Sequence, residues 1–157
     1  MANFSRLLIG FLSPLSAALS LGGCVSTTGE PAKGSIANGG LAATSWRLLS
    51  FQSMDDSQGT TKAGNRTYLL NFNADGSLAA QLDCNRGSAS WNEDISNATG
   101  GTLTIGPVTA TRALCPPPSM GEMLAARLPD VASYTLRDGH LFLALKMDGG
   151  IFEFAPQ

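Results

Sequence analysis

Apolar side chains recur at every second position along much of this chain. The clearest run extends from Tyr68 to Phe72. Successive side chains of an extended strand point to opposite faces, so this spacing gathers the apolar ones on a single buried face. Residues 73–76, Asn-Ala-Asp-Gly, form a turn in which the glycine can take a positive φ, and the alternation resumes from Leu78 to Leu82. The two runs predict an antiparallel hairpin.

The same pattern predicts a mainly β fold. Glycine is frequent, with 18 residues, and only 14% of residues are charged, which is typical of many short strands joined by tight turns. Further strands are expected at residues 46–52, 88–92, 102–105, 108–112, 134–136, 141–145 and 152–154. We expect a strongly bent antiparallel sheet or a cracked β-barrel.

One segment has helical spacing instead. The apolar residues on its common face are Met120, Met123, Leu124 and Leu128. Ser119 and Glu122 form a capping box before it, and Pro129 ends it. We expect this single helix to pack in the open side of the bent sheet, where it covers apolar side chains that the strands leave exposed.

The N-terminus has the features of a bacterial lipoprotein signal peptide. Arg6 precedes an apolar run that ends in Leu21-Gly22-Gly23-Cys24, where small residues before a cysteine predict peptidase cleavage. Residues 1–23 are therefore expected to be removed, and Cys24 to carry the lipid that anchors the protein in the membrane. A retained anchor helix is the alternative. In enteric bacteria an Asp after this cysteine retains lipoproteins at the inner membrane, so Val25 predicts the periplasmic face of the outer membrane.

Residues 24–44 predict a lipidated flexible tether, because they are mostly small or polar. About 20 such residues have a root-mean-square span of ~25 Å. Residues 45–157 predict one folded domain. The chain has 10 basic and 12 acidic residues; without Arg6 the balance is 9 to 12, and no basic cluster occurs. This composition argues against nucleic-acid binding.

Cys84 and Cys115 remain once Cys24 is assigned to the lipid. Two cysteines in a small exported domain most often form a disulfide, although two buried free thiols are the alternative. Their spacing and neighbours suggest no metal site.

Several motifs resemble the META domain, also called the HslJ family. They are Tyr68-x-Leu70-x-Phe72-x-x-Asp75-Gly76, Asp83-Cys84-Asn85, Leu103-x-Ile105-Gly106-Pro107, Thr111-x-x-x-Cys115-Pro116 and Gly139-x-Leu141-x-Leu143. The resemblance covers about 110 residues, nearly the whole predicted domain. It implies a compact bent-sheet or cracked-barrel fold with one helix, in exported or envelope-linked proteins. Members have been tied to heat-shock response, antibiotic tolerance and virulence, with no established enzymatic activity, so no catalytic residue or cofactor is carried over.

The residues themselves suggest little catalytic chemistry. His140 is the only histidine, and no serine is marked as its partner. It is interpreted as a solvated strand residue. Asn85, Arg86 and Arg112 could form a partner-binding surface beside the disulfide, or Asn85 could cap a turn while Arg86 is solvated. Met120, Met123 and Leu124 could line a pocket for an acyl chain or drug, or simply fill the core.

Three functions follow as hypotheses. The first is a non-enzymatic envelope lipoprotein that supports envelope integrity, stress tolerance or antibiotic tolerance through contacts with an envelope protein. The second is a binding module for a lipid or small hydrophobic ligand. The third is an inhibitor of envelope-attacking enzymes such as lysozyme, for which an exposed loop with a carboxylate-seeking Lys or Arg would be the expected mark.

Overall fold

The computed structural model describes residues 40–54 and 59–157. The predicted leader, Cys24 and most of the predicted tether lie outside the described residues. Within the described ranges no helix is long and apolar enough to cross a membrane.

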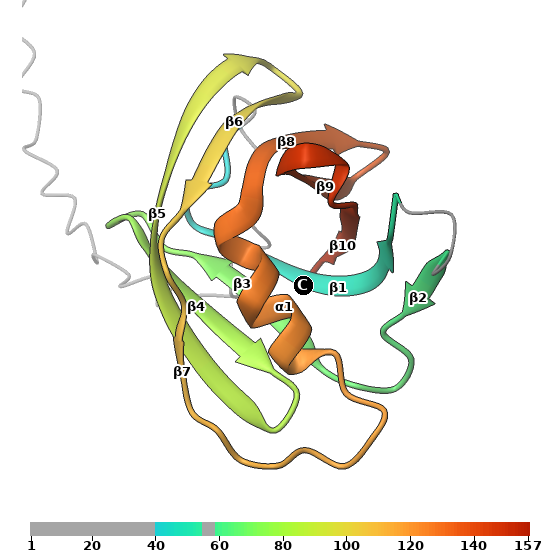
Figure 1. The fold of residues 1–157 in the computed structure, drawn as a ribbon. Coiled ribbons are helices and arrows are strands. Elements are labelled where there is room, and N and C mark those ends of the chain that lie inside the picture. The colour runs from blue at the N-terminus through green and yellow to red at the C-terminus, as the bar shows by residue number, and fades with distance from the viewer. Residues whose placement is uncertain (1–39, 55–58) are drawn as a thin grey trace, which may run out of the picture. The chain divides into compact units, whose positions relative to one another are not determined.

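Eight antiparallel strands form a closed ring, with β1 pairing with β3 on one edge and with β10 on the other. In ring order the strands are β1 (Thr44–Gln52), β3 (Tyr68–Phe72), β4 (Ser77–Leu82), β5 (Asn85–Asn97), β6 (Gly100–Ile105), β8 (Val131–Arg137), β9 (His140–Leu145) and β10 (Ile151–Pro156). Two short strands lie beside this ring: β2 (Thr60–Lys62) pairs with β1, and β7 (Thr109–Ala110) pairs with β5. The strands curve around one interior (Figure 1). The predicted mainly β barrel is confirmed.

The predicted alternation positions the core. In β3, Tyr68, Leu70 and Phe72 are at most 1% exposed and pair across the hairpin with Leu82, Ala80 and Leu78. The hairpin turn is as expected, because Gly76 has φ 81°. Hydrogen bonds from Ser77 hold the pKa of Asp75 in this turn below its ordinary value. Buried side chains of all eight ring strands make one core.

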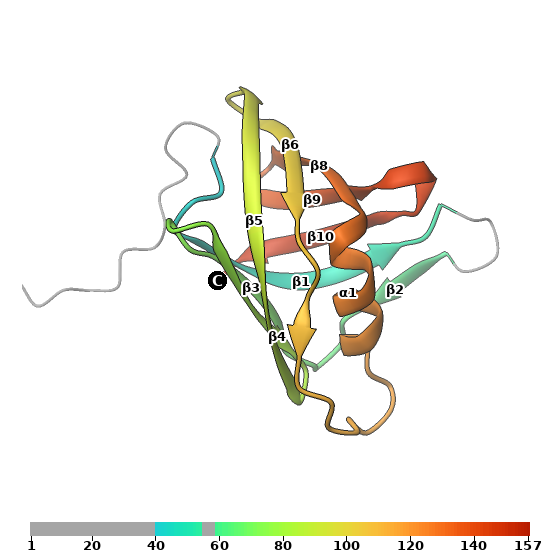
Figure 2. The same ribbon diagram turned by 60° about the vertical axis from the view of Figure 1, so that its left-hand side comes forward.

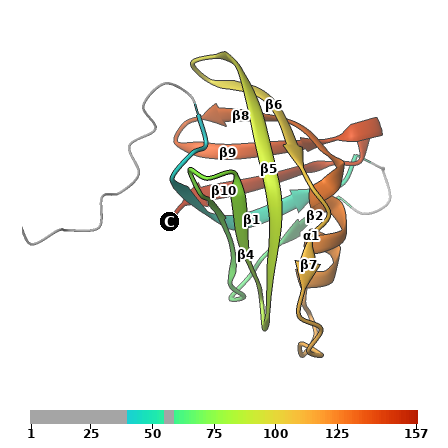
Figure 3. The ribbon, with the colours of Figure 1, turned by 90° about the vertical axis from the view of Figure 1, so that its left-hand side faces the viewer.

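A seam opens on one side of the barrel because β6 pairs with β8 only at Gly100–Thr102. Beyond Thr102, no described strand pairs with the outer edge of β6 or of β7, which follows β6 along the chain. The helix α1 (Gly121–Arg127) occupies this side instead (Figures 2 and 3). Leu124 of α1 and Leu128, which begins the 3₁₀ turn η1 (Leu128–Asp130), are fully buried. The predicted packing of a helix in the open side is confirmed.

Gly121 lets the helix approach the sheet closely. A Cβ added at this position would lie 2.5 Å from the carbonyl oxygen of Leu82, so a larger residue would push the helix away from β4. The predicted capping box is not formed as expected: the helix N-cap is Met120, without a side-chain cap, and Ser119 Oγ accepts the N–H of Gly121 at 3.3 Å. The helix therefore starts one residue later than that motif requires.

The domain begins earlier than residue 45. Leu41 is fully buried, and its N–H donates to Glu93 Oε1 at 3.0 Å. Glu93 also hydrogen-bonds the Tyr134 phenol, whose pKa is raised, first by burial and then by this carboxylate. The predicted tether is therefore too long at its C-terminal end, because an isolated leucine among small residues gives no periodic signal.

Some strand boundaries also differ. β5 is much longer than residues 88–92, and β7 is shorter than residues 108–112. β2 was not predicted, because its three residues are all exposed and carry no apolar pattern. A further 3₁₀ turn, η2 (Lys146–Asp148), separates β9 from β10.

Candidate functional site

Residues 111–119, which connect β7 to α1, are fixed to the barrel at several points, and we call them the clamped loop. The first fixed point is the disulfide between Cys84, at the β4–β5 turn, and Cys115, with a Cα–Cα distance of 5.6 Å. The predicted pairing is therefore present. It ties the approach to α1 to the hairpin on which the helix packs.

The second fixed point is the side chain of Asn85. Its Oδ1 accepts hydrogen bonds from the Ala113 N–H at 2.7 Å and from Thr111 Oγ1 at 2.9 Å. Its Nδ2 donates to the Ala113 carbonyl at 2.9 Å. Asn85 is only 6% exposed. After Thr111 the chain no longer pairs with β5, and the buried amide supplies the hydrogen bonds that a neighbouring strand would otherwise make.

The third fixed point is Arg66, just before β3. Its guanidinium forms a salt bridge with Asp83 at 3.1 Å and donates to the Pro116 carbonyl at 2.7 Å. At the end of the loop, the Met120 N–H donates to the Tyr68 hydroxyl at 2.8 Å in the interior. Both ends and the middle of the clamped loop are thus held by partners distant in sequence.

At its tip this fixed segment carries an exposed apolar side chain. Leu114 is 98% exposed, and Ala113, Pro116, Pro117 and Pro118 beside it are also exposed. A single exposed leucine is common on protein surfaces. A leucine held in solvent by a disulfide and a buried amide is different, because its backbone is already ordered before any partner binds.

Replacing Asn85 with alanine should weaken this arrangement. The substitution leaves the Ala113 N–H and carbonyl without their partner in a partly buried place, which typically costs about 1–3 kcal/mol. Chemical denaturation should show that loss for Asn85→Ala. Arg86→Ala, at the next and exposed position, is the matched control and should change stability by less than about 0.5 kcal/mol. Equal stability of the two variants would show that the amide does not hold the loop.

The structure does not gather Asn85, Arg86 and Arg112 into one surface. Asn85 is buried and its amide holds the loop, and it lines the same cavity as Arg112, whereas Arg86 is not part of that lining. Arg86 lies opposite Thr111 across the β5–β7 pairing, because the Thr111 N–H donates to the Arg86 carbonyl at 2.9 Å. Alternation then turns Arg112 to the other face of the sheet from Arg86. Both arginines are exposed, but on different faces.

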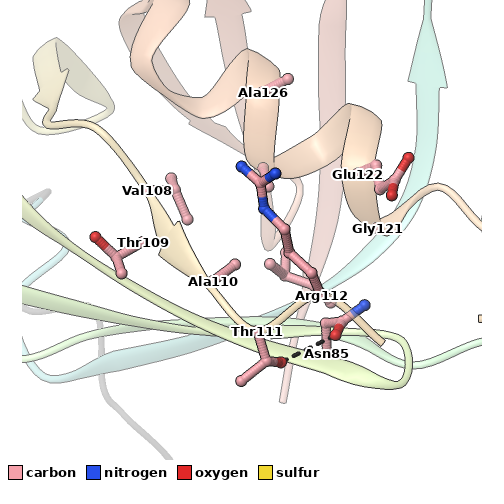
Figure 4. Close-up of a pocket in the computed structure, with 11 residues that line it drawn as sticks. Asn85, Val108, Thr109, Ala110, Thr111, Arg112, Gly121, Glu122 and Ala126 are labelled. Carbon is pink, nitrogen blue, oxygen red and sulfur yellow. Dashed lines mark hydrogen bonds between the residues drawn. The ribbon is translucent and has the colours of Figure 1, made fainter. Parts of the chain in front are cut away.

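Arg112 instead lines a cavity of about 630 Å³ between α1 and the β7 segment. Its apolar lining consists of Leu82, Val108, Ala110, Gly121, Ala125 and Ala126, and its polar lining of Asn85, Thr109, Thr111, Arg112 and Glu122. Figure 4 shows the Arg112 guanidinium extending across the cavity toward Ala126, while the Glu122 carboxylate points away from it. We call this cavity the seam groove, because it lies where the barrel lacks a strand.

The residues expected to line a pocket lie elsewhere. Met120 is 9% exposed and Leu124 is fully buried, both as part of the core, and Met123 packs against that core. None of the three lines the seam groove, whose helix residues are Gly121, Glu122, Ala125 and Ala126. These small groove residues have no apolar periodicity from which they could be predicted.

His140 does have a partner. Its Nδ1 lies 2.9 Å from Glu153 Oε1, and the Ser50 hydroxyl donates to Glu153 Oε2 at 3.1 Å. The hydrogen bond with His140 is the main cause that lowers the pKa of Glu153. The carboxylate lies between serine and histidine, whereas a hydrolytic triad needs the histidine in the middle. This cluster therefore links β1, β9 and β10 without the geometry of a nucleophile.

Among the residues that the structure describes, no group of three or more His, Cys, Asp or Glu side chains could hold a metal ion.

Solved structures with a similar fold support the architecture. An NMR structure of a protein from Burkholderia xenovorans matches with a TM-score of 0.61 at 18% identity, over 74% of this chain and 83% of that one. A crystal structure of a DUF4847 family protein from Bacteroides vulgatus matches with a TM-score of 0.53 at 17% identity, over 73% of this chain and 93% of that one. At these identities the likeness shows the barrel fold alone.

No curated protein matches the sequence. The model of the META domain family, which is not a known enzyme family, matches residues 39–157. These residues include Leu41, the closed barrel, the disulfide and the helix in the seam. The match covers most of the chain and agrees with the motifs around Cys84 and Cys115, so the chain belongs to the META domain family.

Proposed function

We propose that this chain is a lipid-anchored envelope protein whose META domain supports envelope integrity or stress tolerance by contacting another protein, without catalysis. Membership in the META family indicates an envelope-associated protein. The leader of residues 1–23, directly before Cys24, supports a lipid anchor at the N-terminus.

The observation that carries the proposal is the clamped loop. Binding through a flexible loop is weakened by the entropy of ordering it, and a loop already held by a disulfide and by Asn85 avoids most of that cost. Leu114 at its tip is available for an apolar pocket of a partner. Side chains that fill such pockets at the centre of an interface supply most of the binding free energy.

The position of the loop fits this role. The described chain starts beside Glu93 of β5, whereas the loop is held by Asn85, the first residue of the same strand. Eight residues of extended chain separate these points by ~26 Å. The two ends of β5 lie at opposite ends of the domain (Figures 2 and 3). The clamped loop is therefore well separated from the point where the described chain enters the domain.

Site-specific photocrosslinking in living cells tests the proposal. A benzophenone amino acid placed at Leu114 should give a discrete covalent adduct. The same group at Met147, which is 99% exposed on η2, is the matched control and should give none. Leu114→Ser should abolish the association, measured by co-purification of the identified partner, while the melting temperature stays within about 2 °C because the side chain makes no core contact. Identical adducts from positions 114 and 147, or none from either, would contradict the proposal.

The anchor is tested separately. Cys24→Ala should abolish incorporation of radiolabelled palmitate, because only the cysteine thiol accepts the diacylglycerol. Wild-type protein should fractionate with the outer membrane, as Val25 predicts. Label that still enters the variant would refute the lipid anchor and leave the contact role of the loop untouched.

The third hypothesis, enzyme inhibition, is a second candidate because the structure has an exposed, fixed loop with Arg112 near its start. Glycan-cleaving enzymes carry paired carboxylates in an open cleft, and a rigid loop with an arginine could enter one. The purified protein should then inhibit hen egg-white lysozyme stoichiometrically, and Leu114→Ser should reduce this. Unchanged lysis rates at a tenfold molar excess would dismiss this candidate.

A further inference from the structure

We propose that the seam groove binds an extended peptide that carries a carboxylate, by adding a strand to the free edge of β7. This inference does not depend on Leu114 or on the lipid anchor, although the site shares Thr111 and Arg112 with the clamped loop.

Among the described residues, β7 pairs with β5 alone, and its other edge is unpaired. Thr109 and Ala110 pair with Ser88 and Gly87 of β5, and the Thr111 N–H donates to Arg86. In an antiparallel pair, alternate residues turn their N–H and carbonyl groups toward the partner strand and away from it. The backbone groups of Ala110 therefore point away from β5, into the space that β8 would fill if the barrel were fully closed.

The space beside this edge is a groove. β8 pairs with β6 only as far as Thr102, and Pro107 interrupts the chain before β7. Beyond this point the wall facing β7 is the helix α1, whose residues on this side are Gly121, Glu122, Ala125 and Ala126. Mostly small side chains here keep the groove open along the strand edge. A groove between a strand edge and a helix is a known setting for peptide binding by strand addition.

The groove also contains a positive charge. The guanidinium of Arg112 reaches across the groove (Figure 4) and, within the described residues, has no carboxylate or hydrogen-bond partner. Glu122, the acidic residue of the lining, points away from it. An arginine can hold a carboxylate through two parallel hydrogen bonds. The groove thus offers a cation at one place and backbone donors and acceptors beside it.

These features select one class of occupant. The groove volume of about 630 Å³ lies within the range of ligand sites, ~300–1,000 Å³. The five residues from Val108 to Arg112 give an edge of ~16 Å, which suits a peptide of about five residues. Its backbone would pair with Ala110, its small or β-branched side chains would contact Val108 and Ala125, and an acidic side chain or C-terminus would meet Arg112.

Peptide selection on the full-length protein in mild detergent tests this. A phage-displayed library of random linear hexapeptides should enrich acidic, β-prone sequences. The best of them, made as a fluorescein-labelled peptide, should bind in an anisotropy titration. Arg112→Gln should weaken this binding about tenfold, which corresponds to ~1.4 kcal/mol, and Arg112→Lys should weaken it less. Arg86→Gln is the matched control on the opposite face and should leave the affinity unchanged.

Strand addition has its own signature. N-methylation of the peptide residue that pairs with Ala110 should abolish binding, because it removes a backbone donor and leaves the side chains intact. The proposal is overturned if no peptide is enriched, or if the N-methylated peptide binds equally well. It is also overturned if Arg112→Gln and Arg86→Gln change the peptide affinity equally. Binding of decanoate in the groove without binding of the acidic peptide would overturn it too, since the site would then be one for amphiphiles.

Discussion

Removing the disulfide with the double substitution Cys84→Ser and Cys115→Ser should lower the free energy of unfolding by about 3.5–4 kcal/mol. The bond closes a loop with a sequence separation of 31, and the chain-entropy model gives this value for a loop of that length. For a domain of this size the melting temperature should fall by about 10–20 °C. The loss is a large part of the stability of a typical small domain.

Calorimetry and urea unfolding, with and without reductant, measure the effect. Reduced wild-type protein should match the double variant, and Leu114→Ser, which keeps the disulfide, should match oxidised wild type. A loss below about 1 kcal/mol would mean that Asn85 and Arg66 alone determine the position of the clamped loop. The disulfide would then have no major part in preparing Leu114 for a partner.

Leu124→Ala should be the second severe substitution. Leu124 of α1 is fully buried in the core. Truncation of a buried leucine to alanine costs about 2–5 kcal/mol of stability. The cavity would form in the seam, where no strand pairing can close it, so we expect the upper half of that range. Exposure of the interior should also increase binding of a hydrophobic dye.

Glu122→Ala is the matched control in the same helix. Its side chain is exposed, and loss of an acidic residue in the first turn costs at most about 1 kcal/mol. Urea unfolding that finds the two variants equally stable would show that α1 rests on the barrel without closing it.

The sequence was most informative where contacts are local. The hairpin of β3 and β4 follows from alternation and from Gly76, because both strands and their turn lie within 15 consecutive residues, 68–82. The buried face of the helix could also be predicted, since Leu124 and Leu128 repeat at helical spacing and both are buried. The disulfide followed from the number of cysteines and from the compartment that the leader implies.

The sequence was least informative where the position of a side chain depends on register. Arg86 and Arg112 looked like neighbours because both flank a cysteine, but the pairing of Arg86 with Thr111 puts them on opposite faces. Arg66 was not predicted as part of the site, since its salt bridge with Asp83 and its bond to Pro116 join segments far apart in the chain. The groove was not predicted either, because it is the space left where β6 and β8 separate.

The proposed docking role of the clamped loop requires Leu114 to be held still in solvent, and backbone ¹⁵N relaxation of the oxidised protein measures this directly. The order parameter of the Leu114 amide should be about 0.85, as in a rigid strand, and should fall when the disulfide is reduced. A value below about 0.6 in the oxidised protein would show a mobile loop and would contradict a prepared docking element.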